Sequence, residues 1–134
     1  MTKTATNTSF EPISITALPA LGAEFGGGTF EGLITKRDGQ HVAVILLPNK
    51  AQELNWKQAK AWAAEQDGEL PSRPVAAMLY ANSKDKLDPR WHWTDEEDGA
   101  SYAWLCSFDN GGQGYDPKSY EGAAVAVRLI PITA

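Results

Sequence analysis

Few residues of this chain have the types and spacing that metal or nucleophilic chemistry requires. The two histidines, His41 and His92, lie far apart in the sequence, and no pair of cysteines or histidines has the spacing of a zinc site. The single cysteine, Cys106, alternates with Trp104 and Phe108 along an apolar strand face, where burial would raise the pKa of its thiol. We therefore expect no catalytic residue, no bound metal and no cofactor.

Carboxylates are the only other chemical groups that cluster. The run Asp95–Asp98 lacks the alternating ligands and the glycine of a calcium loop, so it indicates a solvated turn. Asp88, Asp95 and Asp109 are candidates for a glycosidase pair, but any acidic protein offers pairs of carboxylates. Calcium binding and an enzyme of unrecognised type stay open as alternatives to a protein without catalytic activity.

The triple glycine Gly26–Gly28 is a second motif with a chemical interpretation. A phosphate-cradling loop needs a strand before it, a helix after it and usually a lysine. Here Phe30, Leu33 and Ile34 follow and predict a strand. The glycines are therefore expected to permit a close approach of two backbones or a bulge.

Aromatic residues are concentrated in the second half of the chain, where they alternate with Asp, Asn, Ser and Gly. They are Trp91, Trp93, Tyr102, Trp104, Phe108, Tyr115 and Tyr120. Tyrosine and tryptophan beside short polar residues are typical of binding loops. Strand parity favours a core position for Trp104 and for at least one of Trp91 and Trp93, whereas a glycine-rich loop favours exposure of Tyr115 and Tyr120. The residues expected to bind a ligand are Trp91, His92, Asp95, Glu96, Asp109, Asn110, Tyr115 and Tyr120.

Composition limits the partners and the compartment. The 134 residues carry a net charge of −5, from 17 acidic and 12 basic side chains, which argues against nucleic-acid binding. No apolar run approaches the ~20 residues of a membrane helix, and no apolar segment of a signal peptide follows Met1. A single cysteine cannot form an intrachain disulfide. A fold without disulfides suits the reducing host cytoplasm, or a virion that is assembled there. Residues 1–10 are expected to form a flexible leader and residues 11–134 a single domain.

Two helices are predicted in the middle of the chain. Asn55–Gln66 has a capping box, Asn55 with Gln58, an apolar face with Trp56 and Trp62, and Gly68 at the expected C-terminal cap. Ser72–Asn82 has Ser72 as its N-cap and Pro74 in its first turn.

Strands are predicted on both sides of these helices. Asp38-Gly39 indicates a hairpin between Phe30–Thr35 and the strand His41–Leu47, which is apolar at both parities and which Pro48-Asn49 should end. The other strands expected are Glu11–Thr16, Trp91–Thr94, Ser101–Phe108 and Ala123–Ile132, with turns at Asp95–Gly99 and Asp109–Gln113 and an irregular segment at Gly114–Gly122. This order predicts an α+β fold in which two helices pack on an antiparallel sheet.

Several short motifs, in order along the chain, resemble the Lcl C-terminal-like family of short phage and prophage proteins. They are Gly22–Gly32, Leu46-Leu47-Pro48, Leu54–Ala59, Leu70–Arg73, Trp93-Thr94-Asp95, Ala103-Trp104, Phe108–Gly111 and Val127-Arg128. The resemblance implies a C-type-lectin-like fold that displays loops on a stable frame, in a phage or prophage setting. The chain departs from the family on both sides of the leucine-proline step. Gly68-Glu69 stand where the family has a tryptophan and an arginine, and Pro74-Val75 stand where it has a Glu-Leu pair. The Glu-Pro-Asn and Trp-Asn-Asp motifs of calcium-dependent lectins are missing, so sugar binding of that type is not implied.

These observations favour a binding module without catalytic activity, which recognises a protein or a glycan through the aromatic-rich loops from Trp91 to Tyr120. The alternative is a small intracellular phage factor, similar to an anti-CRISPR protein, that inhibits a host protein such as an antiviral defence component. An acidic surface that includes Asp95–Asp98 would then meet a basic partner. Neither hypothesis involves nucleic acid or a membrane, and both leave a homo-oligomer open.

Overall fold

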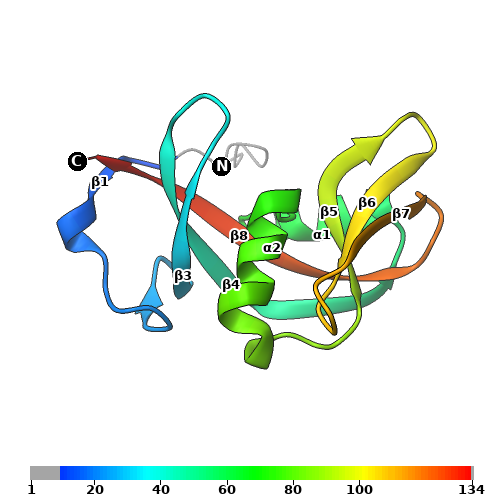
Figure 1. Ribbon diagram of the computed structural model, residues 1–134, viewed down its shortest axis with the longest axis horizontal. Helices are drawn as coiled ribbons and strands as arrows, with labels where there is room; N and C mark the ends of the chain where they lie inside the picture. The colour runs from blue at the N-terminus through cyan, green and yellow to red at the C-terminus, as the bar shows by residue number, and fades with distance from the viewer. Residues whose placement is uncertain (1–9, 134) are drawn as a thin grey trace.

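The computed structural model describes residues 10–133, so all but the last residue of the expected leader lies outside the described residues. Within this range the chain forms two α-helices and a large, mostly antiparallel sheet, as expected (Figure 1). The strands are β1 (Ile13–Ser14), β2 (Glu24–Phe25), β3 (Gly28–Thr35), β4 (His41–Leu54), β5 (Trp91–Asp98), β6 (Tyr102–Ser107), β7 (Gln113–Pro117) and β8 (Gly122–Thr133). The helices are α1 (Trp56–Glu65) and α2 (Arg73–Ser83), with short 3₁₀ helices at Ile15–Ala17 and Lys84–Lys86.

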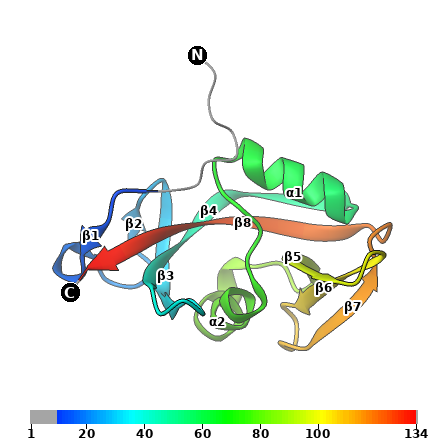
Figure 2. The same cartoon turned by 90° about the horizontal axis from the view of Figure 1, so that it is seen from above.

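The sheet is organised around its two longest strands. Its order is β2-β3-β4-β8-β5-β6-β7, and β1 pairs with the end of β8. Helices α1 and α2 lie on opposite sides of β4 and β8 (Figure 2). The strand expected over Glu11–Thr16 is shorter in the structure: only Ile13 and Ser14 pair with β8, and a 3₁₀ turn follows them.

Strand β4 is covered on both faces, as its two-sided apolar pattern predicts. Ala43 and Ile45 belong to a core with α1, whereas Val44 and Leu46 belong to a second core with α2. Strand β8 divides in the same way, because Ala124 and Ala126 face the first core and Val125 and Val127 face the second. The backbones of β4 and β8 therefore separate the two cores, and β6 divides in the same way, with Leu105 in the first core and Cys106 in the second.

The prediction that Pro48-Asn49 ends this strand is wrong. Pairing with β8 is interrupted between Leu46 and Lys50 and resumes at Lys50, which lies opposite Val125. Proline has no N–H to donate to a ladder, and an irregularity is where a strand tolerates it. Pro48 therefore marks a break within β4 and not its end.

The glycine-rich segment forms the tight connection from β2 to β3. Gly26 and Gly27 have φ values of 64° and 90°, and a Cβ added at Gly28 would overlap the carbonyl oxygen of Leu46. A strand follows the glycines, as expected, and they allow β3 to pair closely with β4.

Helix α1 begins with the expected capping box. The Asn55 side chain accepts a hydrogen bond from the Gln58 N–H, and the Gln58 side chain accepts one from the Asn55 N–H, at 2.9 and 3.0 Å. Trp56 is buried, whereas Trp62 is only partly buried. After the helix the left-handed conformation falls on Asp67, with φ 60°, and not on Gly68, which the prediction had placed at the cap.

Helix α2 also begins as expected, with the Ser72 hydroxyl accepting from the Val75 N–H at 3.3 Å. Its far end is tied to β3 by Glu31, which is 3% exposed. The Glu31 carboxylate accepts hydrogen bonds from Ser83 at 2.8 Å and Lys86 at 2.7 Å, and a third from Thr29. This buried charge fixes the position of α2 on the sheet.

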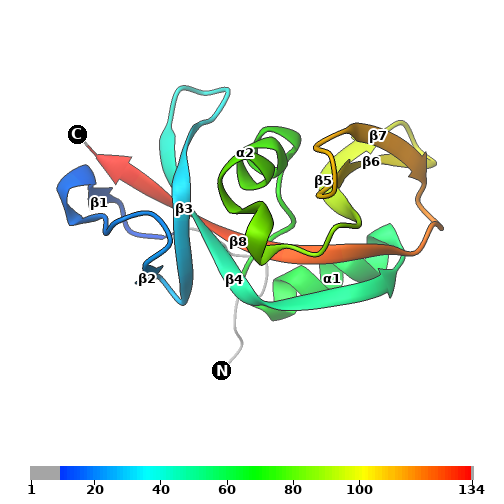
Figure 3. The same cartoon turned by 60° about the horizontal axis from the view of Figure 1, so that its bottom comes forward.

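Strands β5, β6 and β7 form a three-stranded unit beyond α2 (Figure 3). A parallel contact between His92 and Ala123 joins this unit to β8. Two predictions are wrong here. The acidic run 95–98 continues β5 after a bulge and is no turn, and the segment expected to be irregular contains β7.

Candidate functional site

The predicted ligand contact His92 lies in the interior. It is 1% exposed, its ring packs on Phe108 at 4.5 Å between centroids, and its Nδ1 lies 2.9 Å from the Arg90 carbonyl oxygen. Burial lowers the pKa of His92, and the Arg90 hydrogen bond only partly opposes this effect, so the ring is neutral at pH 7. His92, which the sequence predicted as a ligand contact, is therefore enclosed in the core and not presented at the surface.

The other predicted aromatic contacts are exposed but do not form one site. Trp91 shares strand parity with Trp93, which lies opposite Leu105, so it projects from the face of the unit opposite to that of Trp104. Tyr120 packs edge-on against Trp93, at 6.0 Å between centroids. Tyr115 pairs with Trp104 on the other face. Trp91 and Tyr120 are therefore separated from Tyr115 by the sheet.

Tyr115 belongs to a row of rings that we call the aromatic face: Tyr102 and Tyr115, which are exposed, and Trp104, which is half-buried. Tyr102 and Trp104 are two residues apart on β6, and Tyr115 lies beside both on β7. Its ring meets theirs edge to face, at 5.9 and 5.1 Å between centroids. Tyr115 is 54% exposed and Tyr102 is 42% exposed, and Asp98 lies opposite Tyr102 on β5. The contacts hold the rings in a fixed arrangement at the surface.

Arg73, the first residue of α2, covers Trp104. Its guanidinium carbon lies 3.5 Å from the Trp104 ring centre, and its Nε donates to the Gln113 side chain at 2.9 Å. The Gln113 amide donates back to the Arg73 carbonyl oxygen at 2.9 Å, and the Glu96 carboxylate accepts from the Arg73 N–H at 2.8 Å. Glu96, a predicted ligand contact, is therefore engaged at the start of a helix, where a negative charge is stabilising.

Sequence reasoning missed three of these residues. Strand parity predicted a core position for Trp104, because Cys106 and Phe108 share its face, and Tyr102 was not among the predicted contacts. Apolar residues of α2 cover the Cys106 end, whereas only the Arg73 side chain lies on Trp104, so the face changes from core to surface along one strand. Arg73 carried no sequence signal, because its contact is with a strand far along the chain.

A groove of about 850 Å³ is lined by Ser72 and Pro74, the neighbours of Arg73 in the chain, and by three acidic residues, and we call it the acidic groove. Its walls come from the β3–β4 hairpin, the start of α2 and the bulge of β5. The residues that line it include Ile34, Thr35, Lys36, Arg37, Gln40, Val42, Glu69, Ser72, Pro74, Val75, Asp95, Glu96 and Leu129. The Asp95 N–H donates to the Pro71 carbonyl oxygen at 3.0 Å, which holds the bulge against the chain that leads into α2.

Two carboxyl groups in the acidic groove have raised pKa values. Burial, and then the charge of Glu96, raises the pKa of Asp95 to about 6. Burial, and then the charge of Asp95, raises the pKa of Glu69, while Lys36 acts in the opposite direction. Within residues 10–133 neither side-chain carboxyl has an ion pair. Asp95 was among the predicted contacts and Glu69 was not.

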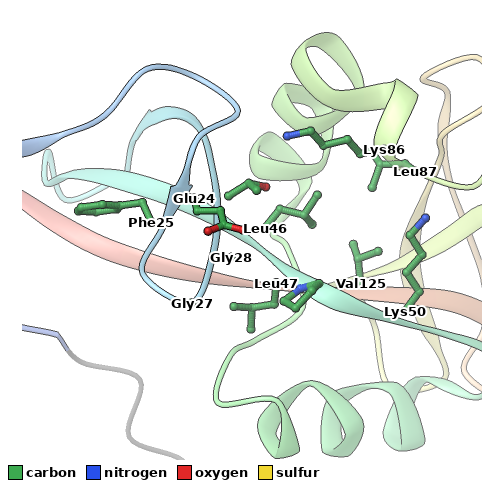
Figure 4. A pocket seen from close by; sticks show the side chains of 12 residues that line it. Glu24, Phe25, Gly27, Gly28, Leu46, Leu47, Lys50, Lys86, Leu87 and Val125 are labelled. Carbon is green, nitrogen blue, oxygen red and sulfur yellow. The ribbon is translucent and has the colours of Figure 1, made fainter.

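A second hollow, of about 510 Å³, lies between the glycine turn, β4 and the segment after α2 (Figure 4). Its walls are mainly apolar, with Leu46, Leu47 and Leu87 among them. Its two lysines are already paired, Lys86 with Glu31 at 2.7 Å and Lys50 with Asp88 at 3.6 Å. The hollow therefore offers mainly apolar contact, with Glu24 as its one charged lining residue that forms no ion pair among the described residues.

The remaining predicted contacts, Asp109 and Asn110, are exposed in the turn between β6 and β7. The Asn110 side chain accepts from the Gly112 N–H at 2.9 Å, so it stabilises the turn. Cys106 is fully buried, and burial raises the pKa of its thiol, as expected from its apolar neighbours.

No model of a known protein family matches this chain, and a search of curated proteins gives no match either. Within residues 10–133 no group of three or more His, Cys, Asp or Glu side chains is arranged to hold a metal ion. In the same part of the chain, no helix has the length and apolar character needed to cross a membrane.

Proposed function

We propose that the protein is a non-catalytic binding module that recognises a protein partner through the aromatic face. The observation that carries this proposal is the row of Tyr102, Tyr115 and Trp104, exposed or half-buried, with Arg73 stacked beside it. Tryptophan, tyrosine and arginine are the residues that most often dominate the binding energy of protein interfaces. Because edge-to-face contacts already order the rings, little side-chain entropy is lost on binding.

A protein fits this surface better than a glycan. Sugars stack on an open aromatic ring face, but the Arg73 guanidinium lies over Trp104. We propose that the frame is C-type-lectin-like, with a phage or prophage setting as its resemblance implies. The acidic groove and the net charge of −5 favour the form of this function in which a small phage factor blocks a basic surface of a host protein.

The test compares capture of partners by three tagged proteins from cells that carry the gene: wild type, Tyr102→Ala/Tyr115→Ala and Tyr120→Ala. We expect a protein captured by wild type and by Tyr120→Ala to be lost from the double variant, with a fall in affinity of at least about a hundredfold in titrations of the purified pair. Tyr120→Ala is the matched control, because it removes an exposed tyrosine from the opposite face.

Melting temperatures of the three proteins show whether a loss of capture is a loss of folding. A partner retained by a folded double variant would overturn the proposal, as would binding to a glycan array that depends on these tyrosines. Recovery with phage particles or with a soluble host complex distinguishes a display module from an inhibitor.

A further inference from the structure

We propose that the acidic groove receives a lysine or arginine side chain of the protein partner that lies on the aromatic face. This inference rests on the proposed function and adds the chemistry of the partner. It joins three observations: the size and lining of the groove, the absence of ion pairs at Glu69 and Asp95 among the described residues, and its continuity with the aromatic face.

The lining of the groove matches a long side chain with a cationic end. Apolar residues, among them Ile34, Val42 and Val75, offer contact for methylene groups. Glu69 and Asp95 offer carboxylate oxygens for an ammonium or guanidinium group. About 850 Å³ is ample for one such side chain, and it lies within the range of ligand sites.

The electrostatics of the groove favour a cation. The charge of Asp95 raises the pKa of Glu69, which is partly buried, and the charge of Glu96 raises that of Asp95, so like charges repel one another along the groove. A bound cation would relieve this repulsion and would interact more strongly there than in bulk water.

Basic residues of the chain itself also face the groove. Lys36 and Arg37 lie in the hairpin wall, and Lys60 of α1 acts on Asp95 from a distance. None of the three forms an ion pair with Glu69 or Asp95. Lys36 nevertheless lowers the pKa of Glu69, so its positive charge acts on the same carboxylate that a bound cation would contact. Removal of Lys36 should therefore tighten the binding of an added cation.

Arg73 makes the groove and the aromatic face one continuous surface. Ser72 and Pro74, on either side of it, line the groove, and its side chain lies on Trp104. Its N–H is bound by Glu96, another lining residue. A partner segment that crosses the start of α2 would thus reach both surfaces.

The experiment titrates the ¹⁵N-labelled protein with three blocked amino acids: Nα-acetyl-lysine amide, Nα-acetyl-arginine amide and, as the uncharged match, Nα-acetyl-norleucine amide. Amide shifts at Glu69, Asp95 and Thr35 report on the groove. We expect both cationic probes to shift these signals and to bind at least about tenfold more tightly than the norleucine probe.

Variants assign the binding to the groove. Glu69→Gln/Asp95→Asn should abolish it, Lys36→Gln should tighten it, and Asp109→Asn, which removes an exposed carboxylate outside the groove, should leave it unchanged. The spectrum of each variant shows that it is folded. Equal binding of all three probes, shifts outside the groove, or unchanged binding to Glu69→Gln/Asp95→Asn would overturn the proposal. Because small probes need no contact with the aromatic face, failure of the proposed function would leave this result unaffected.

Discussion

Glu31 and Asp95 are both carboxylic acids on strands, yet their surroundings shift their pKa values in opposite directions. At Glu31 burial alone would raise the pKa, but hydrogen bonds from Lys86, Thr29 and Ser83 outweigh it and lower the pKa. At Asp95 burial and the charge of Glu96 act together and raise it to about 6. Glu31 therefore stabilises the fold as an anion, whereas ionisation of Asp95 works against folding.

Asp95→Asn should remove a pH dependence of stability. The pKa of Asp95 is about 6 in the folded chain against an ordinary 3.8, so the folded state holds this proton more tightly. The stabilisation is present below about pH 4 and is lost as the pH rises through about 6. In urea denaturation at about pH 4.5 and about pH 7.5, wild type should lose more stability on raising the pH than Asp95→Asn does.

His92 has the opposite influence in the same pH range, because burial lowers its pKa. It is present in both proteins, so it cancels when their pH dependences are compared. Asp109→Asn removes an exposed aspartate from the β6–β7 turn and should behave as wild type. Equal pH dependences in wild type and Asp95→Asn would contradict the raised pKa.

Residue types alone identified part of the candidate site. Tyr115 and Asp95 were expected at a binding surface and lie on the aromatic face and in the acidic groove. The sequence could not show that His92, unlike these two residues, is buried. Period-two alternation assigns residues to the two faces of a strand but does not show whether both faces are covered. In β5 both Trp93 and His92 are buried, since the strand joins β8 and lies beneath α2.

At the scale of elements, signals that act within a few residues predicted well. The capping box of α1, the Ser72 cap of α2 and the Asp-Gly hairpin all depend on local hydrogen bonds and were placed correctly. Strand ends depend on a partner far along the chain. Pairing with β8 carries β4 past Pro48, and pairing with β6 orders β7. Those bounds could not be derived from the segments themselves.

Two glycine substitutions should separate the need for space from the need for a left-handed backbone. Gly28→Ala places a methyl group on the carbonyl oxygen of Leu46, within the pairing of β3 with β4. We expect it to cost about 3 kcal/mol of unfolding free energy, the upper end of the usual range for overpacking. Gly39→Ala meets no atom within 4 Å, and its φ of 88° limits the cost to about 1–2 kcal/mol.

Urea denaturation of both variants beside wild type measures the difference. A cost for Gly28→Ala no greater than that for Gly39→Ala would show that β3 can shift to make room. The close approach of β3 and β4 would then not be the reason that a glycine is needed at position 28.

At the scale of the whole molecule, the two cores share the strands that separate them. Leu70 and Leu79 are both almost fully buried, Leu70 in the core with α1 and Leu79 in the core with α2. Neighbouring residues of β4 and β8 face alternate cores. Loss of one core would therefore expose one face of both strands and weaken the support of the other. The expected single domain over 11–134 requires that the two cores unfold together.

Leu70→Ala and Leu79→Ala test this cooperativity, because each creates a cavity in one core and costs about 2–5 kcal/mol. Fluorescence of the buried tryptophans, Trp56 and Trp93, reports on the α1 core, and access of a thiol reagent to Cys106 reports on the α2 core. In each variant both signals should shift to lower urea concentration by the same amount and remain coincident, as in a two-state transition. If Leu79→Ala exposes Cys106 while the tryptophans stay buried, the α2 core unfolds on its own. The aromatic face and the acidic groove, which both depend on the start of α2, would then be lost before the rest of the fold.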